Sequence, residues 1–498
     1  MMKNFHKKES PLPTLVGLGG GSGGSLYPSL GESYFIGVFG TSSNNETSDY
    51  EPAIAIDSSE NIYIVTKSYG FYSTTGFNPS PLLMKYNKKG EFQWQRVFHA
   101  GAGMDVEDIA CDSSGGIYIG GHHYYQAGTG QGSNVGIVVK FNSSGDIEWS
   151  RSAGSGSSDE YRGIATDSSD NVYICGYGHS RTGSSSYKDF QIEKWNSSGT
   201  HQSTRYVGDN TTQARGWSIT IDSSGNYYPC GYISDGSLGV FVGKFNSSHS
   251  PSWRKRIWYS GNSTNSQGGI EVDSSGNVYI VGDTNRGSTG SRDMFIMKLD
   301  SSGNTSWQRY LGTSSRTTYG RDIAIDNSGN IYVIGFGGID YDAAPVYPYT
   351  NTMDTILIAK YDNSGTIQWK RFLGVMISPL QSGNYTDVEQ GRSIKVDPTG
   401  KNLYICGQTK NGNFGYGGDD VVWAKLPTDG SGIGTYSGPG AKDIIYGDAT
   451  NVTSKSGSLS NDSYTMGYGS LTTYAYSNDS VDASYTSDAS KTTVEIVT

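Results

Sequence analysis

The side chains best suited to bind a ligand are aromatic and histidine residues that stand among glycine and serine. They are His122, His123, Tyr124, Tyr125, Tyr177, His179, Tyr341, Tyr347, Tyr349, Phe414 and Tyr416. Tyrosine beside glycine and serine is typical of binding loops, because it forms large contacts at a low cost in conformational entropy. Aromatic rings also stack on sugar rings. The composition therefore predicts a binding surface, and packing of one loop on another is the alternative interpretation.

Residues that could carry catalysis are fewer. His122, His123 and His179 could hold a metal ion, but their spacing matches no zinc motif. Asp340 and Asp342 could form the acid pair that a glycosidase needs, although solvated loop carboxylates are the simpler interpretation. Outside the Gly-Ser run of residues 19–24, the sequence contains no Gly-x-Ser-x-Gly motif, P-loop or dinucleotide fingerprint. We therefore predict a protein that is not an enzyme and has no catalytic residue, metal or cofactor.

The candidate residues lie between copies of a repeat that must position them. The stretch Asp273-Ser-Ser-Gly-Asn-Val-Tyr-Ile-Val-Gly282 occurs seven times in variant form. The other copies begin at Asp57, Asp112, Asp167, Asp222, Asp326 and Asp397. A second motif begins at Lys298, with counterparts at Lys85, Lys140, Lys194, Lys244, Lys360 and Lys425. Each motif is typical of strand, tight turn and strand, so one unit supplies a four-stranded antiparallel sheet. Seven units predict an all-β fold, a seven-bladed β-propeller, over residues 33–426.

Strand direction predicts which end of this ring binds. The short turns within the motifs should emerge at one end, and the longer connections, which differ in every copy, at the other. Variable loops on a rigid scaffold are where binding usually occurs. We therefore expect the candidate residues on the loop face formed by the longer connections.

The N-terminal part of the repeat region predicts how the ring closes. The segment from Phe35 to Ser43 aligns with the segment from Trp307 to Ser315, so Phe35 stands where the outer strand of a blade has its Trp. The seventh unit, from Arg392 to Leu426, supplies only three strands. We expect the N-terminal segment to be the outer strand of the last blade, which would leave the ring without an open end.

The residues that recur in every copy are expected to be structural. The repeat Asp and the Ser-Ser-Gly after it fit a tight turn, whereas a calcium loop needs more carboxylates. A Tyr recurs at one strand position, and a Trp followed two residues later by Arg or Lys recurs at another. Cys175, Cys230 and Cys406 share a single strand position, and Cys111 replaces an apolar residue. Packing explains these patterns better than a binding site does, and the cysteines leave the compartment undetermined.

Composition limits the class of partner. The formal net charge is -10 and the pI is about 5.2, so the basic footprint of a nucleic-acid binder is missing. No run is long enough to span a membrane. The first residues are basic, but the apolar stretch after them is too short for a signal peptide.

The two ends of the chain differ from the repeat region. Residues 1–32 contain Pro11, Pro13 and a Gly-Ser run that would be flexible alone. Residues 427–498 are rich in Ser, Thr, Asp, Gly and Tyr and suit either a low-complexity tail or an extended arm that forms strands. We expect both ends to be arms that contact a neighbouring protein.

The Asp-Ser-Ser-Gly-Asn-Val-Tyr-Ile-Val-Gly pattern resembles the seven-bladed β-propeller repeat family of bacterial and viral surface proteins, which implies the fold but no catalytic residues. The two ends also look like those of virion proteins from marine tailed phages. This second resemblance implies a structural or adhesive appendage at the virion surface. Its arms would contact other virion proteins, its loop face would bind host glycans, and it could form a homo-oligomer. A secreted bacterial adhesion protein and a propeller glycan hydrolase or lyase are the alternatives, and paired carboxylates at the channel mouth would favour the last.

Overall fold

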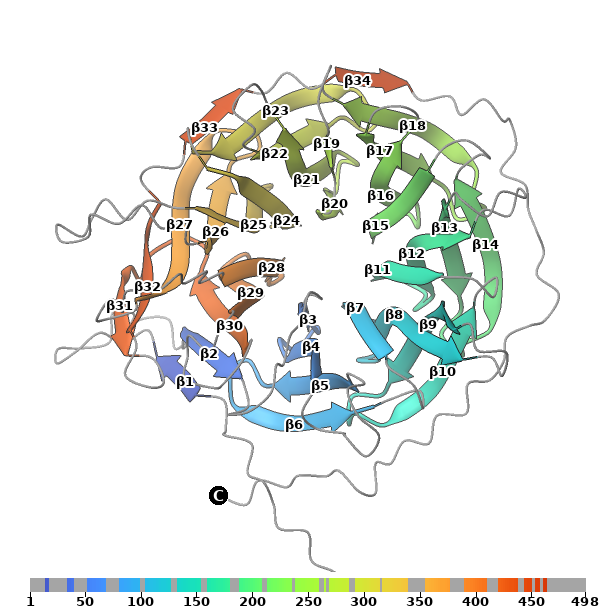
Figure 1. Ribbon diagram of the computed structural model, residues 1–498, viewed down its shortest axis with the longest axis horizontal. Helices are drawn as coiled ribbons and strands as arrows, with labels where there is room; N and C mark the ends of the chain where they lie inside the picture. Colours follow the sequence, from blue (N-terminus) through green and yellow to red (C-terminus); the bar gives the residue numbers. More distant parts are fainter. Residues whose placement is uncertain are drawn as a thin grey trace, which may run out of the picture.

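The protein forms a ring of seven β-sheets around a central axis, which confirms the predicted all-β, seven-bladed propeller with four-stranded antiparallel blades (Figure 1). The computed structural model describes residues 14–17, 34–39, 52–68, 80–98, 104–126, 132–153, 159–179, 188–207, 213–234, 238–258, 264–265, 268–285, 292–313, 316–338, 354–376, 389–409, 420–437, 443–449, 453–456 and 460–463. These residues include no helix, and therefore none that could span a membrane.

The first four blades follow one another along the chain, and in each of them the strands succeed one another from the axis outwards. Blade one is β3 (Ala53–Ile56), β4 (Ile62–Ser68), β5 (Ser80–Tyr86) and β6 (Phe92–Val97). Blade two is β7 (Met104–Cys111), β8 (Ile117–Gln126), β9 (Gly132–Phe141) and β10 (Ile147–Ala153). Blade three is β11 (Glu160–Thr166), β12 (Val172–His179), β13 (Lys188–Trp195) and β14 (His201–Val207). Blade four is β15 (Gln213–Ile221), β16 (Tyr227–Ser234), β17 (Leu238–Phe245) and β18 (Pro251–Trp258).

The last three blades complete the ring. Blade five is β20 (Ile270–Val272), with the short β19 (Thr264–Asn265), then β21 (Val278–Asn285), β22 (Arg292–Leu299) and β23 (Thr305–Gly312). Blade six is β24 (Thr318–Ile325), β25 (Ile331–Gly338), β26 (Asp354–Tyr361) and β27 (Ile367–Met376). Blade seven is β28 (Glu389–Val396), β29 (Asn402–Thr409), β30 (Asp420–Pro427) and β2 (Phe35–Phe39).

The N-terminal strand closes the ring as the alignment predicts. Strand β2 pairs antiparallel with β30, with Phe35 opposite Lys425, just as Trp307 lies opposite Lys298 in blade five. The Phe35 side chain is 1% exposed and packs against Trp423 with ring centroids 4.9 Å apart. The last blade is therefore built from both ends of the propeller sequence.

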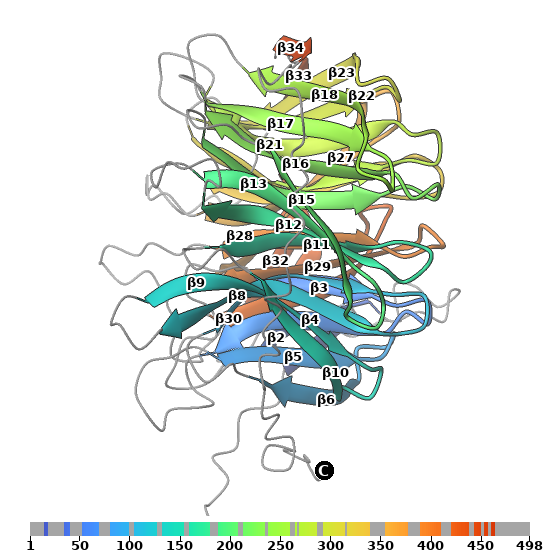
Figure 2. The same cartoon turned by 90° about the vertical axis from the view of Figure 1, so that its right-hand side faces the viewer.

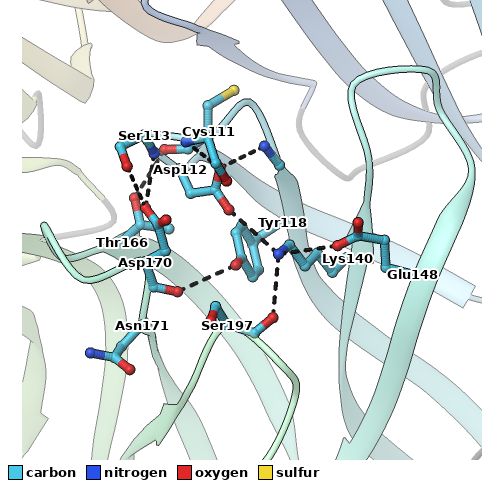
Figure 3. Close-up of polar contacts among 12 residues, drawn as sticks. Cys111, Asp112, Ser113, Tyr118, Lys140, Glu148, Thr166, Asp170, Asn171 and Ser197 are labelled. Atoms are coloured by element: carbon cyan, nitrogen blue, oxygen red, sulfur yellow. Dashed lines mark hydrogen bonds and ion pairs between the residues drawn. The ribbon is translucent and has the colours of Figure 1, made fainter.

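The repeat Asp is a turn residue, as predicted. In blade two, Asp112 Oδ1 accepts hydrogen bonds from the backbone N–H groups of Ser114 and Gly116. Ser113 of the same turn donates from its N–H and its hydroxyl to Asp170 of blade three, at 3.0 and 2.8 Å (Figure 3). Figure 2 shows such short turns on one side of the ring, at the right of the view. The turns both reverse the chain and join neighbouring blades.

The recurrent Tyr and Trp are packing residues, as predicted. The seven Tyr rings lie at buried strand positions, and each has a Lys ammonium from the neighbouring strand of its own blade over its face, as Lys298 lies 5.1 Å from the Tyr279 ring centroid. Trp307 donates its indole N–H to the carbonyl of Asn363 in the next blade, and Arg309 donates to Gly365 O at 2.7 Å. The base after the Trp therefore pairs with the next blade's turn.

Blade three lacks this Trp, and the next blade compensates for it. Ser203 stands at the Trp position, and His249 replaces the glycine that lies under the Trp elsewhere. The His249 ring bonds to the Ser203 hydroxyl and, at 2.7 Å, to the Tyr227 hydroxyl. An imidazole from the neighbouring turn thus fills the space that the indole leaves.

Four blades carry further strands outside the ring. They are β1 (Thr14–Gly17), β31 (Gly434–Ser437), β32 (Asp443–Asp448), β33 (Thr453–Ser456) and β34 (Ser460–Ser463). These parts of the two predicted arms pair with the chain's own blades. Contact of the arms with a neighbouring protein stays a prediction.

The cysteines are free thiols within the sheets. Cys175, Cys230 and Cys406 are buried, as predicted, and Cys111 is half-buried. Burial raises the pKa of the thiols of Cys111, Cys175 and Cys406, so these three are protonated at neutral pH.

Candidate functional site

The inner strands of the seven blades surround the axis of the ring (Figure 1). Each has a buried Ile three residues before the repeat Asp, namely Ile54, Ile109, Ile164, Ile219, Ile270, Ile323 and Ile394. Two residues before this Ile, five of the strands contain a β-bulge. The extra residue in each bulge is Glu107, Arg162, Trp217, Arg321 or Arg392. A bulge redirects a side chain out of the regular alternation and is common beside active sites.

These five residues, which we call the bulge layer, line a cavity of about 280 Å³ in the central channel. Inner strands of all seven blades contribute to its wall. The bulged residues lie five residues before the repeat Asp, close to the middle of their strands. The bulge layer therefore lies inside the channel, between the short turns at one end of the ring and the longer connections at the other.

Arg162 is the centre of an ion-pair network in the bulge layer. Its guanidinium lies 2.7 Å from Glu107 and 2.6 Å from Glu160, and 5.0 Å from the Trp217 ring centroid. Burial acts to raise the pKa of Glu160, but the charges of His122 and Arg162 outweigh it and lower the pKa to about 2. This carboxylate is therefore ionised over the whole physiological range and holds Arg162 in place.

The other side of the bulge layer is cationic and aromatic. Arg321 lies 3.7 Å from Asp283 and 4.9 Å from the Phe336 ring centroid, and Arg392 lies 5.5 Å from the same ring. Trp217 is partly exposed, and its indole N–H has no hydrogen-bond partner among the residues the structure describes. This nitrogen is buried, so the part of Trp217 that the cavity can offer to a ligand is its ring.

A second layer lies deeper, and two of its members are structural. Asp322 accepts hydrogen bonds from the N–H groups of Ile323, at 2.8 Å, and of Ile394 in the next blade, at 2.9 Å. Asp108 makes the same pair of bonds with Ile109 and Ile164, at 2.8 and 3.0 Å. Each of these aspartates therefore joins the inner strands of two blades.

Glu271 and Lys395 complete this deep layer. Burial raises the pKa of Glu271 to about 7, against the opposing charge of Lys395. Burial likewise raises the pKa of Asp108 to about 6. Burial alone would lower the pKa of Lys395, but Asp322, Glu271 and Asp108 raise it, so the ammonium stays charged. Three carboxyl groups and one ammonium thus converge, and Glu271 can donate or accept a proton near neutral pH.

Of the predicted binding residues, the structure places the side chains of three. His122 is buried in β8, 3.3 Å from Asp105 and 3.6 Å from Glu107. His123 is also buried, with Nε2 3.1 Å from the Ser152 hydroxyl. Tyr177 is buried in β12, where its hydroxyl bonds to Glu160. These residues lie in strands and not on loops, because β8 and β12 run further than their sequence pattern predicts. His122 and Tyr177 support the bulge layer through Glu107 and Glu160.

The remaining candidates lie partly or wholly outside the described residues. Tyr124, Tyr125 and His179 belong to β8 and β12, but their side chains are not among those described. Five candidates and the two loop carboxylates considered as an acid pair lie outside the described residues altogether: Tyr341, Tyr347, Tyr349, Phe414, Tyr416, Asp340 and Asp342. Binding by the loop face stays a prediction.

Neither the bulge layer nor the deep layer was predicted from the sequence, although a signal for them exists. The Ile three residues before the repeat Asp is constant, whereas the residue two positions earlier is Pro52, Glu107, Arg162, Trp217, Gly268, Arg321 or Arg392. A position that varies between charged, aromatic and small residues beside a constant one indicates a role outside packing.

Two segments of the chain match a family of known repeats. The Beta-propeller repeat family, SBBP, matches residues 148–181 and 307–341. Each match runs from the outer strand of one blade to the second strand of the next. No curated protein matches the sequence.

Solved structures match the chain at low identity and with TM-scores below 0.5. The polysaccharide lyase Uly1 is 11% identical with a TM-score of 0.46, and the match covers 81% of this chain and 94% of the lyase. The gluconolactonase XC5397 of Xanthomonas campestris is 10% identical with a TM-score of 0.34, covering 77% and 97%. A Trypanosoma rangeli sialidase mutant with trans-sialidase activity is 11% identical with a TM-score of 0.37, covering 78% and 54%. At these identities the likeness concerns the fold alone.

These structures correct one prediction. We predicted from the absence of known motifs that the protein is not an enzyme, but all three of these similar propellers are enzymes. The absence of a motif therefore excludes nothing in this fold, and the likeness assigns none of these reactions to this chain. The chain is therefore a seven-bladed β-propeller in which two segments match the SBBP repeat.

Proposed function

We propose that the protein binds one sugar unit of a glycan in its central channel, on the bulge layer. The observation that carries this proposal is the variety of the bulged residues beside one constant residue. Every blade keeps the buried Ile three residues before the repeat Asp, while the bulged residues two positions earlier differ and line one cavity. Packing requires no such variety at equivalent positions.

The chemistry of the bulge layer suits a polyhydroxylated ligand. Carboxylates accept hydrogen bonds and guanidinium groups donate them in fixed directions, so Glu107 beside Arg162 offers both to neighbouring hydroxyls. The partly exposed ring of Trp217 offers an apolar face to the C–H groups of a sugar. A cavity of about 280 Å³ is at the small end of ligand pockets, which favours a single sugar unit over a longer chain.

A panel of monosaccharides tests the proposal, with binding followed by saturation-transfer NMR and calorimetry. The panel contains neutral hexoses, N-acetylhexosamines and uronic acids, because the guanidinium groups could also bind a carboxylate. We expect Trp217→Ala and Arg392→Gln each to weaken binding at least tenfold. Lys89→Ala, at an exposed position in a short turn at one end of the ring, is the matched control and should bind normally. Failure of every sugar to bind, or unchanged binding by Trp217→Ala, would contradict the proposal.

Cleavage of the bound glycan is a second candidate, and the convergence of carboxyl groups in the deep layer favours it. Glu271, with a pKa of about 7, can protonate a leaving oxygen at neutral pH, as general acid catalysis requires. Glu271→Gln keeps the shape but cannot donate this proton. Reducing ends released from a glycan library should fall at least a hundredfold in this variant while sugar binding persists. Release at the wild-type rate would exclude Glu271 as the acid.

Attachment to a host surface and location at a virion surface stay proposals drawn from the ends of the sequence. The channel site does not depend on either. A protein that binds sugar would suit both the virion appendage and the secreted adhesion protein.

A further inference from the structure

Strands outside the propeller cover the outer edges of four of its seven blades. Strand β1 pairs with β2 on blade seven, β32 with β27 on blade six, β33 with β23 on blade five and β34 with β18 on blade four. Figure 1 shows β32, β33 and β34, coloured red, outside the ring. We call these three strands the outer belt. The chain therefore passes around the ring in one direction, from blade six to blade four.

The outer belt contacts each blade in the same register. Asp448, Ser456 and Ser463 lie opposite Arg371, Arg309 and Lys255, respectively. These three bases occupy one repeated position, two residues beyond the Trp of the outer strand. Eight residues separate the first two belt positions and seven separate the next two. One step from blade to blade thus requires seven or eight residues.

The outer edges of the other three blades are bare in the part of the chain that the structure describes. The outer strands β14, β10 and β6 of blades three, two and one have no strand beyond them there. An edge strand presents a row of backbone N–H and C=O groups that can pair with another strand. Arg205, Arg151 and Arg96 hold the repeated base position on these edges. Blades three, two and one follow next in the direction of the belt, and their outer edges therefore carry the same repeated base position as the edges that the belt covers.

We propose that residues 464–498 continue the outer belt and pair with β14, β10 and β6 in turn. The length suffices, because 35 residues follow Ser463 and three further steps need about eight residues each by the spacing of the described belt. The sequence also fits. Strand β34, Ser460-Asn-Asp-Ser463, recurs as Ser477-Asn-Asp-Ser480, which is 17 residues later. Two steps of about eight residues each span about 16 residues, so the second copy lies close to the position that would pair with β10.

The continued belt would give every blade an additional outer strand. Recruitment of a strand to a sheet edge gains main-chain hydrogen bonds and removes an edge on which aggregation could begin. Two features would then stabilise the ring. Strand β2 closes it within blade seven, and the continued belt would pair with blades around its circumference.

Hydrogen exchange measured by mass spectrometry tests the proposal on the complete chain and on a chain that ends at Ser463. Amides of β14, β10 and β6 should exchange at least tenfold faster in the shortened chain, while those of β18, β23 and β27 should not change. Equal exchange of β14, β10 and β6 in the two chains would overturn the proposal.

A substitution in the complete chain gives a second test that does not shorten the protein. Asn478→Pro with Asp479→Pro removes two consecutive N–H donors, so one of them must face the blade. The exchange of β10 should rise at least tenfold and that of β18 should stay the same. Asn461→Pro with Asp462→Pro is the positive control, because the structure pairs these residues with β18. Light scattering of the complete chain and of the chain that ends at Ser463 shows whether the added strand comes from the same molecule. A complete chain that is a dimer and a shortened chain that is a monomer would show that a second copy supplies the strand, and would overturn the proposal.

Discussion

Five side chains at the bulged positions distinguish this propeller from its own repeat. In each of these five inner strands the bulge removes one residue from the alternation that buries its neighbours, so that residue can face the channel. Glu107 and Arg162 then neutralise each other at 2.7 Å, while Trp217 keeps an indole N–H without a partner among the described residues. The chemistry of the channel therefore depends on residues that packing does not constrain.

Glu271 should make the stability of the protein depend on pH. Burial raises its pKa to about 7, whereas in an unfolded chain a Glu titrates near pH 4.3. The stabilisation is thus complete below about pH 4.3 and is lost as the pH rises to about 7. Glu271→Gln lacks this loss, so its melting temperature relative to wild type should rise between pH 5 and pH 7.5. The corresponding change in the free energy of unfolding, relative to wild type, should be of the order of 1–2 kcal/mol, because water in the channel weakens the effect of burial on Glu271. A difference that stays constant over this range would contradict the assignment.

Ser203 and His249 should behave as a coupled pair. Ser203→Trp alone should cost about 1–3 kcal/mol in the free energy of unfolding, because the new indole competes with the His249 ring for one space. Adding His249→Gly restores the arrangement of the other blades and should recover at least about 1 kcal/mol. Urea denaturation of both single variants and the double variant measures the coupling. Strict additivity would show that the imidazole does not fill the place of the missing Trp.

At the scale of the strand and turn, the sequence predicts almost all the structural features that recur in each blade. Asp, Ser and Gly at fixed places define the turns, and the constant Tyr defines the second strand of each blade. The bulges could not be predicted in the same way, because they become visible only in the strand register. The boundary of β8 was missed for a related reason: His122 and His123 look like loop residues, yet inside the sheet they lie beside the polar side chains of Asp105, Glu107 and Ser152.

Alanine substitutions at two turn glycines compare the energetic cost of an unfavourable backbone conformation with the cost of a steric clash. Gly225 and Gly365 have φ angles of 78° and 77°, so alanine at either should cost about 1 kcal/mol. An added Cβ meets nothing within 4 Å at Gly225 but lies 2.7 Å from Trp307 at Gly365. Gly365→Ala should therefore be less stable than Gly225→Ala by roughly a further 1–3 kcal/mol. Equal stability of the two variants in urea would show that the indole moves aside without cost.

At the scale of the whole molecule, the sequence predicts the ring and its closure but not the channel. Closure follows from a direct alignment, whereas the cavity requires seven inner strands to be placed around one axis. The outer belt was also beyond prediction, because the Ser- and Thr-rich end of the chain carries a strand signal too weak to show its partner. Parts of both arms that we expected to contact a neighbour lie on the chain's own blades.

The substitution Phe35→Ala tests whether β2 holds the ring closed. Phe35→Ala should reduce the free energy of unfolding by about 3–5 kcal/mol, the usual cost for a buried Phe, and should loosen β28, β29 and β30 together. Phe92→Ala, at a partly buried place in the outer strand of blade one, is the control and should cost less. Thermal melting of the two variants makes the comparison. An equal loss would mean that β2 contributes no more than the outer strand of any other blade and does not hold the ring closed.

The central claim is that the bulge layer binds a sugar unit, and a crystal structure with the tightest-binding sugar of the panel tests it most directly. We expect the sugar in the central channel, with one face on the Trp217 ring and hydroxyl groups bonded to Arg162, Arg321 or Arg392. A sugar bound only on the loop face, with the channel holding solvent alone, would contradict the claim.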